Sequence, residues 1–144
     1  TRRGPATGVP MNRADLEFLE GGNYVSFATK KRSGEWVATP VWFAPEGGSY
    51  YVFSAGEAGK VKRLRNFKES RIAPCTVTGT LTGNWMNTRA CVLDAPEDED
   101  TALGALRRKY GWQMLAADFF SRLSGKMQKR AYIRIDPAEP LPKR

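Results

Sequence analysis

Short segments of alternating polarity, joined by turns that contain glycine, constrain the fold of this chain more than any other feature. The segment Asn23–Thr29 (NYVSFAT) places Val25, Phe27 and Thr29 on one side of an extended strand. The turn Lys31–Gly34 joins it to the next segment, as in an antiparallel hairpin. The further predicted strands are Glu35–Ala44, Ser49–Ser54, Arg71–Thr78, Leu81–Asp94 and Ala131–Ile135.

Pro40 lies inside the second of these segments. A proline has no backbone N–H, so it is confined to edge strands or to interruptions of a sheet. We therefore expect this strand to be an edge of the sheet, or to be interrupted, near Thr39 and Pro40. Backbone groups of the neighbouring residues would then be open to a ligand.

Helices are predicted between and after the strands. Asn12 is a suitable N-cap for a helix over Arg13–Glu20, and the segment Lys60–Lys68 predicts a basic helix. A third helix begins at Pro96, with acidic residues in its first turn and basic residues in its last, which suits a helix dipole better than a metal site. A fourth helical stretch is predicted over Trp112–Leu123. This order predicts a small antiparallel barrel of mainly β or α+β class.

The chain of 144 residues contains no histidine. This excludes a Ser-His-Asp triad, a Cys-His dyad, histidine-ligated zinc and a haem held by a proximal histidine. The two cysteines, Cys75 and Cys91, are too few and too far apart for a zinc cluster or a CxxC pair, and we expect them to be buried thiols. If the protein is an enzyme, we expect a cofactor to supply the chemistry.

The net charge is +8, from 23 basic and 15 acidic residues. Such a balance favours anionic partners, among them phosphorylated ligands, nucleic acids and acidic membrane surfaces. Much of the charge lies in the predicted basic helix, which follows a loop containing Gly56 and Gly59. Glycines before a helix N-terminus favour a bound anion, and Lys60 adds a full charge there. The loop is neither a P-loop nor a GxGxxG motif, and a solvated basic helix face is the alternative.

Two segments together resemble a known family. Ala38–Phe43 (ATPVWF) and Ser54–Arg65 (SAGEAGKVKRLR), with NYVSFAT before and RIAPCTVTG after, are similar to the flavin and deazaflavin oxidoreductases of the pyridoxamine-phosphate-oxidase-like split barrel. They resemble in particular the deazaflavin (coenzyme F-420)-dependent branch. The similarity runs from about Asn23 to Asp94, with a weaker match at Lys109–Gln113 (KYGWQ). It implies a six-stranded antiparallel split β-barrel of the FMN-binding type, with peripheral helices.

The resemblance also implies a homodimer with the cofactor between the subunits, and a set of residues that bind it. Lys60 matches the family's phosphate-binding lysine. The strand beginning at Thr39 matches the one along the planar ring, and Ser54 lies at a strand end beside the phosphate. The implied cofactor-binding residues are Thr39, Pro40, Val41, Trp42, Ser54, Ala55, Lys60, Val61, Lys62, Arg63 and Arg65.

Each of these residues has a structural alternative. Aromatic residues such as Trp42 are more often core than ligand contacts. The basic residues of one helix cannot all reach one phosphate, so some of them are solvated or meet the oligoglutamate tail of the deazaflavin.

The chain departs from pyridoxamine phosphate oxidases at two motifs. Their Arg-x-His substrate motif is absent, which argues against oxidation of pyridoxamine phosphate. ATPVWF replaces their Arg-x-x-Leu-Leu-Lys flavin pattern, which weakens FMN as the cofactor without excluding it. We expect hydride transfer from reduced coenzyme F-420 to an unsaturated or electrophilic organic substrate. An FMN-dependent reductase or oxidase, and a non-catalytic cofactor-binding barrel, are the alternatives. The proton donor stays unassigned among Tyr50, Tyr51, Lys60 and a water.

The organisation predicted for the chain is one domain over residues 11–136, a flexible arm over 1–10 and a tail over 137–144. No apolar run exceeds four residues, and the first twenty residues contain no apolar core of a signal peptide. We therefore expect a cytoplasmic protein. Nucleic-acid binding rests on charge alone, because no helix-turn-helix or RNP-like pattern supports it.

Overall fold

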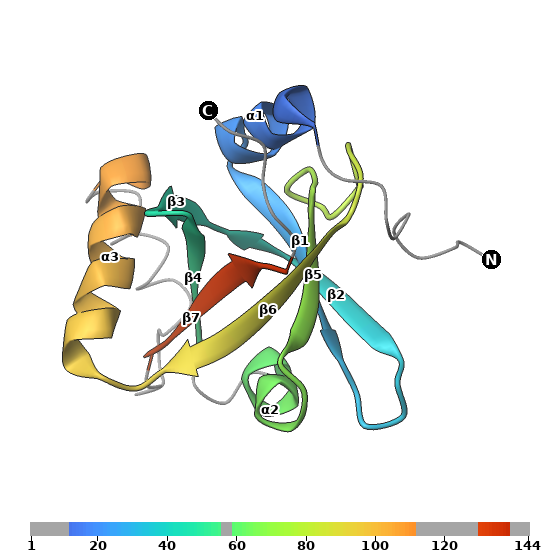
Figure 1. Cartoon of the computed structure of the whole chain (residues 1–144), viewed down its shortest axis with the longest axis vertical. Helices are drawn as coiled ribbons and strands as arrows, with labels where there is room; N and C mark the ends of the chain where they lie inside the picture. The colour runs from blue at the N-terminus through green and yellow to red at the C-terminus, as the bar shows by residue number, and fades with distance from the viewer. Residues whose placement is uncertain (1–11, 56–58, 112–129, 139–144) are drawn as a thin grey trace.

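In the computed structural model, which describes residues 12–55, 59–111 and 130–138, seven strands form one curled antiparallel sheet (Figure 1). The strand order is β2-β1-β5-β6-β7-β4-β3. The strands are β1 (Tyr24–Lys30), β2 (Trp36–Trp42), β3 (Ala44–Glu46), β4 (Ser49–Ala55), β5 (Glu69–Pro74), β6 (Met86–Leu93) and β7 (Arg130–Pro137). The helices are α1 (Arg13–Gly21), α2 (Gly59–Asn66) and α3 (Pro96–Tyr110). The predicted antiparallel split-barrel architecture is confirmed.

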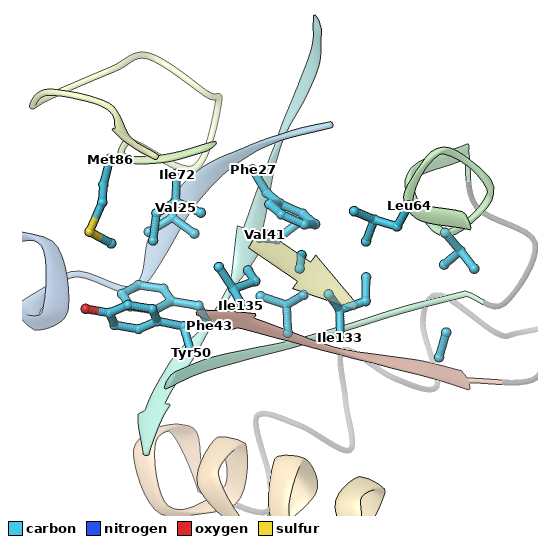
Figure 2. Close-up of a cluster of buried hydrophobic side chains, with 14 of the residues drawn as sticks. Val25, Phe27, Val41, Phe43, Tyr50, Leu64, Ile72, Met86, Ile133 and Ile135 are labelled. Carbon is cyan, nitrogen blue, oxygen red and sulfur yellow. The ribbon is translucent and has the colours of Figure 1, made fainter. Parts of the chain in front are cut away.

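The inner face of the sheet encloses the main core, and a helix contributes to it at each end (Figures 1 and 2). Leu19 of α1 enters the core at one end, and Val61 and Leu64 of α2 enter it at the other. Asn12 caps α1 as predicted, because its side chain accepts a hydrogen bond from the backbone N–H of Asp15 at 2.8 Å. The strand side chains of this core include Val25, Phe27, Val41, Tyr50, Val52, Ile72, Ile133 and Ile135.

Helix α3 covers the outer side of β3, β4 and β7 (Figure 1). Ala102, Ala105 and Leu106 form its buried stripe, at the spacing of one helix face. They pack against Tyr51, Leu93 and Tyr132 of the sheet. The helix begins at Pro96, has acidic residues in its first turn and ends on basic residues, as the sequence predicts.

The predicted single strand over Glu35–Ala44 is wrong, because the chain passes from one edge of the sheet to the other near its end, at Phe43. Residues up to Trp42 pair with β1, whereas Ala44 begins β3, which pairs with β4. Phe43 joins the two strands and is fully buried. The Tyr110 hydroxyl of α3 accepts a hydrogen bond from Phe43 N at 3.1 Å and lies 2.7 Å from Phe43 O. This contact satisfies the backbone where neither ladder reaches it.

The predicted edge position of Pro40 is confirmed. Strand β2 ends the described strand order, and Pro40 faces Ser26 of β1. The absent N–H is tolerated here because alternate residues of an edge strand direct their N–H and C=O groups away from the neighbour.

The strands around the β5–β6 connection are shorter than predicted. β5 ends at Pro74, not at Thr78, and β6 begins at Met86, not at Leu81. A Cβ atom at position 83 would lie 2.5 Å from Pro74 Cγ, so Gly83 permits a close approach that bends the connection away from the sheet.

Three of the predicted segments fall wholly or largely outside the described residues: the arm over 1–10, the helix over Trp112–Leu123, and the tail, of which only residues 137 and 138 are described. None of the described helices is long and apolar enough to cross a membrane.

Candidate functional site

Arg63 of α2 is held in a fixed position against β1, and its guanidinium reaches back to the first turn of the helix. Val61 and Leu64 anchor the helix in the core, which turns Arg63 toward Thr29. Arg63 Nε–H donates a hydrogen bond of 2.6 Å to Thr29 Oγ1, and Thr29 is fully buried. A Cβ atom at position 59 would lie 2.7 Å from Arg63 Nη1, so the guanidinium occupies space that a larger residue would fill. The cation is therefore pinned at the helix start.

Arg63 carries its charge in a partly dehydrated environment. Burial lowers the pKa of its guanidinium. Among residues 12–55, 59–111 and 130–138, no carboxylate forms an ion pair with it. Lys60 is half-buried on the first turn of the same helix, where backbone N–H groups lack intrahelical partners. Two cations and a helix N-terminus suit an anionic group such as a phosphate.

The second part of the site is the open edge of β2. Thr39 Oγ1 is buried and has no hydrogen-bond partner among the described residues. No described strand pairs with the outer edge of β2. Pro40 has no N–H and occupies a position whose backbone groups face away from β1. Backbone direction alternates along a strand, so Ala38, two residues earlier, directs its N–H and C=O to the same outer side. The edge of a planar ring could receive hydrogen bonds from these groups.

The two parts lie close together along one strand. Val37 is paired with Thr29, the residue that holds Arg63, and Ala38 and Pro40 follow it on β2. At about 3.3 Å per residue, Pro40 lies roughly 10 Å along the strand from Val37. A molecule that joins a planar ring to a phosphate can therefore reach both parts.

Several residues implied by the resemblance have side chains that pack in the core or face solvent. The side chains of Val41 and Val61 belong to the core, so only their backbones remain for a cofactor. Trp42 stacks on Tyr110, with ring centroids 4.7 Å apart and planes inclined by 14°, and packs with the α3 cluster. Lys62 and Arg65 lie on the exposed side of α2.

The two strand-end residues have simpler positions. Ser54 and Ala55 are the last two residues of β4. Three residues separate Ala55 from Gly59, where α2 begins. Ser54 is half-buried.

The tyrosines weighed as proton donors lie apart from Arg63. The Tyr50 hydroxyl donates a hydrogen bond of 2.6 Å to Glu20 Oε2, at the α1 end of the core. Tyr51 packs under α3, and burial raises its pKa. Neither is placed to serve the first turn of α2.

The outer side of β2, β1 and β5 carries a cluster that sequence reasoning did not identify. Arg71 reaches across Ala28 and places its guanidinium 4.0 Å from the centre of the Trp36 ring. Lys30 Nζ lies 5.5 Å from the same ring and 2.9 Å from Glu69 Oε1. Burial lowers the pKa of Arg71, and its Nε has no hydrogen-bond partner among the described residues.

Thr29 was also missed as a site residue, because a threonine at an inward position of a strand is typical of the core. Gly59 was predicted only as a loop glycine that favours a bound anion, not as the residue beneath Arg63. The signal available in the sequence was the position of Gly59 four residues before Arg63, which places both on one helix face.

Comparison with known proteins identifies the fold. No protein-family model matches the sequence, and no curated protein matches it. Among solved structures, a candidate pyridoxamine 5'-phosphate oxidase from Listeria innocua is similar, with 14% identity, a TM-score of 0.58, and 86% of this chain and 90% of that chain covered. A conserved hypothetical protein from Mycobacterium tuberculosis has 18% identity and a TM-score of 0.64 over 96% of this chain and 87% of that one.

HutZ, the haem storage protein from Vibrio cholerae, is similar over 92% of this chain and 93% of its own, with 14% identity and a TM-score of 0.64. The chain thus has the split-barrel fold of proteins related to pyridoxamine 5'-phosphate oxidase. The described sheet has one strand more than the six expected, because the short β3 is a separate strand.

Proposed function

We propose that the protein is a cofactor-dependent oxidoreductase that uses reduced coenzyme F-420 and an unsaturated or otherwise electrophilic organic substrate. The observation that carries the proposal is the combination of a pinned cation at the start of α2 with an open strand edge at Pro40. Both features lie on segments that resemble the deazaflavin-dependent enzymes, and a cofactor that carries both a ring and a phosphate can reach both of them.

The residues present fit such a group. The Arg63 guanidinium and the buried hydroxyl of Thr39, which has no partner among the described residues, are features that a bound anionic cofactor would complete. Lys60 and Arg63 would hold the phosphate, and the β2 edge near Ala38 would orient the ring. When bound, the deazaflavin supplies a hydride. The chain itself supplies binding, orientation and shielding from water, and it needs no nucleophile.

Binding and turnover test this proposal. The purified protein is titrated with coenzyme F-420 and with FMN by calorimetry, and we expect F-420 to bind more tightly. The proposal would be refuted if neither cofactor binds with a Kd below about a hundred micromolar, which corresponds to a binding free energy of roughly 5–6 kcal/mol. Oxidation of reduced F-420 by enone, quinone or tetrapyrrole acceptors, measured by absorbance, then distinguishes an enzyme from a carrier. Tighter binding of FMN would favour an FMN-dependent reductase of the same fold.

A non-catalytic ligand carrier is the second candidate, because one structural neighbour is a haem storage protein. The sequence has no histidine to act as a proximal haem ligand, which weakens this candidate. A haem titration followed by the Soret band distinguishes the two. A stoichiometric Soret shift without turnover of any cofactor would favour the carrier.

We further propose that two copies associate through the outer side of β1, β2 and β5, with the cofactor between subunits. Helix α3 covers the outer side of the other half of the sheet. On the half that contains β1, β2 and β5, Ser26, Ala28 and Ala73 are themselves buried, and the half-buried side chains of Trp36 and Arg71 lie together on the outer side. These two side chains would contact the second copy. Light scattering that reports a mass near 16.1 kDa, the mass of one chain, would contradict this.

A further inference from the structure

Gly59 is a glycine for a reason other than backbone conformation. It is not among the described glycines with a positive φ, so an L-residue can adopt its backbone geometry. Glycine in a helix is instead unfavourable relative to alanine. The Arg63 guanidinium lies in the space that a side chain would take: Nη1 would be 2.7 Å from a Cβ atom at position 59, so an alanine there would displace the end of Arg63.

The position of the guanidinium follows from helix geometry. Residues four apart share one helix face, and the Cα–Cβ bond tilts toward the N-terminus. The side chain of Arg63 therefore extends back over Gly59, toward the first backbone N–H groups of α2. A long arginine side chain ordinarily samples many rotamers, and ordering it has an entropic cost.

Thr29 restricts that freedom. Its hydroxyl is fully buried on β1 and accepts the Nε–H hydrogen bond at 2.6 Å. Because Nε is the donor engaged, the two terminal nitrogens of Arg63 are oriented together by one bond. Both edges of a guanidinium can donate pairs of hydrogen bonds, and a fixed one binds an oxyanion with less loss of freedom.

We propose that Thr29 and Gly59 are positioning residues for the anionic group of the cofactor: Thr29 anchors the Arg63 guanidinium, and Gly59 leaves the space in which it lies. The inference rests on the proposed function for the identity of the ligand, a phosphorylated cofactor. Both residues would thus affect binding through Arg63, without touching the ligand themselves.

Two variants and two matched controls test the proposal. Gly59→Ala displaces the end of Arg63, and Thr29→Val removes its anchor. Gly104→Ala is the control for the first, because its Cβ would meet Arg108 Nη1 at an ordinary 3.5 Å. Thr88→Val is the control for the second, because Thr88 is also buried but its hydroxyl is hydrogen-bonded to the Ser70 hydroxyl, at 2.6 Å, and not to Arg63.

Affinity for coenzyme F-420 and for FMN is measured by calorimetry, and stability by urea unfolding. We expect Gly59→Ala and Thr29→Val each to weaken binding about tenfold, the lower end for a charge-assisted hydrogen bond. Both controls should bind as the unaltered protein does. Gly59→Ala should not lower the midpoint of unfolding, because alanine favours the helix. Thr29→Val and Thr88→Val should lower it by similar amounts.

The Nε–H resonance of Arg63 in the NMR spectrum gives a readout that does not need the cofactor. It should exchange slowly with water in the unaltered protein and lose that protection in Thr29→Val. Addition of inorganic phosphate should shift it, and Gly59→Ala should weaken that response.

The outcomes separate this inference from the proposed function. If a cofactor binds the unaltered protein and both variants equally, the positioning role is wrong and the proposed function stands. If Thr88→Val weakens binding as much as Thr29→Val, the effect is structural and the positioning role is also overturned. If neither cofactor binds, the proposed function fails. A phosphate-induced shift of the Arg63 Nε–H resonance that both variants reduce would still support the positioning role. Absence of that shift would overturn the positioning role as well.

Discussion

The Tyr110 hydroxyl supports the point at which the chain passes from β2 to β3, and its removal is the most informative single-atom change. It contacts both backbone groups of Phe43, at 3.1 Å to N and 2.7 Å to O, and lies 2.7 Å from Asn23 O. Phe43 is fully buried, so water cannot replace the hydroxyl. The substitution Tyr110→Phe keeps the ring, its stacking on Trp42 and the packing of α3.

The magnitude follows from the groups left unsatisfied. A buried backbone donor or acceptor without a partner costs about 1–3 kcal/mol, so loss of contacts to Phe43 N and O predicts a destabilisation of about 2–6 kcal/mol. This is a large part of the 5–15 kcal/mol typical of a domain. Urea unfolding followed by tryptophan fluorescence measures it, with the slope expected to stay constant.

The substitution Tyr24→Phe is the control, because the described residues offer the Tyr24 hydroxyl no hydrogen bond while its ring also packs against Trp42. We expect it to change stability by less than about 0.5 kcal/mol, as surface-type changes do. A loss below about 1 kcal/mol in Tyr110→Phe would show that the junction is satisfied in another way, and the reasoning would be refuted.

Three further predictions follow from the site and from the buried charges. Lys60→Ala should reduce cofactor affinity about ten- to hundredfold, by loss of a charge-assisted contact. Lys68→Ala, at an exposed position beyond the end of α2, should change the affinity far less. Equal effects of the two variants in calorimetry would show that the basic residues of α2 face solvent and do not bind the cofactor. Burial lowers the pKa of Lys109 from 10.5 to about 8, although its ammonium lies 3.5 Å from the Phe43 ring centre and donates to Gly22 O at 2.6 Å. The unfolded chain therefore binds more protons between about pH 8 and 10.5, so stability should rise over that range relative to Lys109→Met; parallel unfolding profiles at pH 7 and 9.5 would contradict this. Arg71→Glu should convert the proposed dimer to a monomer in light scattering, because it removes the cation held over Trp36 and places a carboxylate near Glu69; an unchanged mass would exclude this surface as the interface.

Local patterns were sufficient wherever the determinant lies within a few residues. Asn12 caps α1, Pro96 opens α3 above an acidic first turn, and the alternation over Asn23–Thr29 forms β1, because each depends on backbone conformation and near neighbours. Pro40 could be assigned to an edge from its covalent structure alone, since no sheet interior accepts a residue without an N–H.

Side-chain partners distant in sequence could not be read in the same way. Thr29 and Arg63 are 34 positions apart, and Phe43 and Tyr110 are 67 apart. The bond between the first pair orients the candidate phosphate contact, and the bond between the second divides one predicted strand into two. Both depend on the curl of the sheet, which brings its two edges and the start of α2 around one core. Val61 shows the opposite case: the resemblance implied a ligand contact, whereas helix periodicity alone places its side chain on the packed face, and it lies in the core.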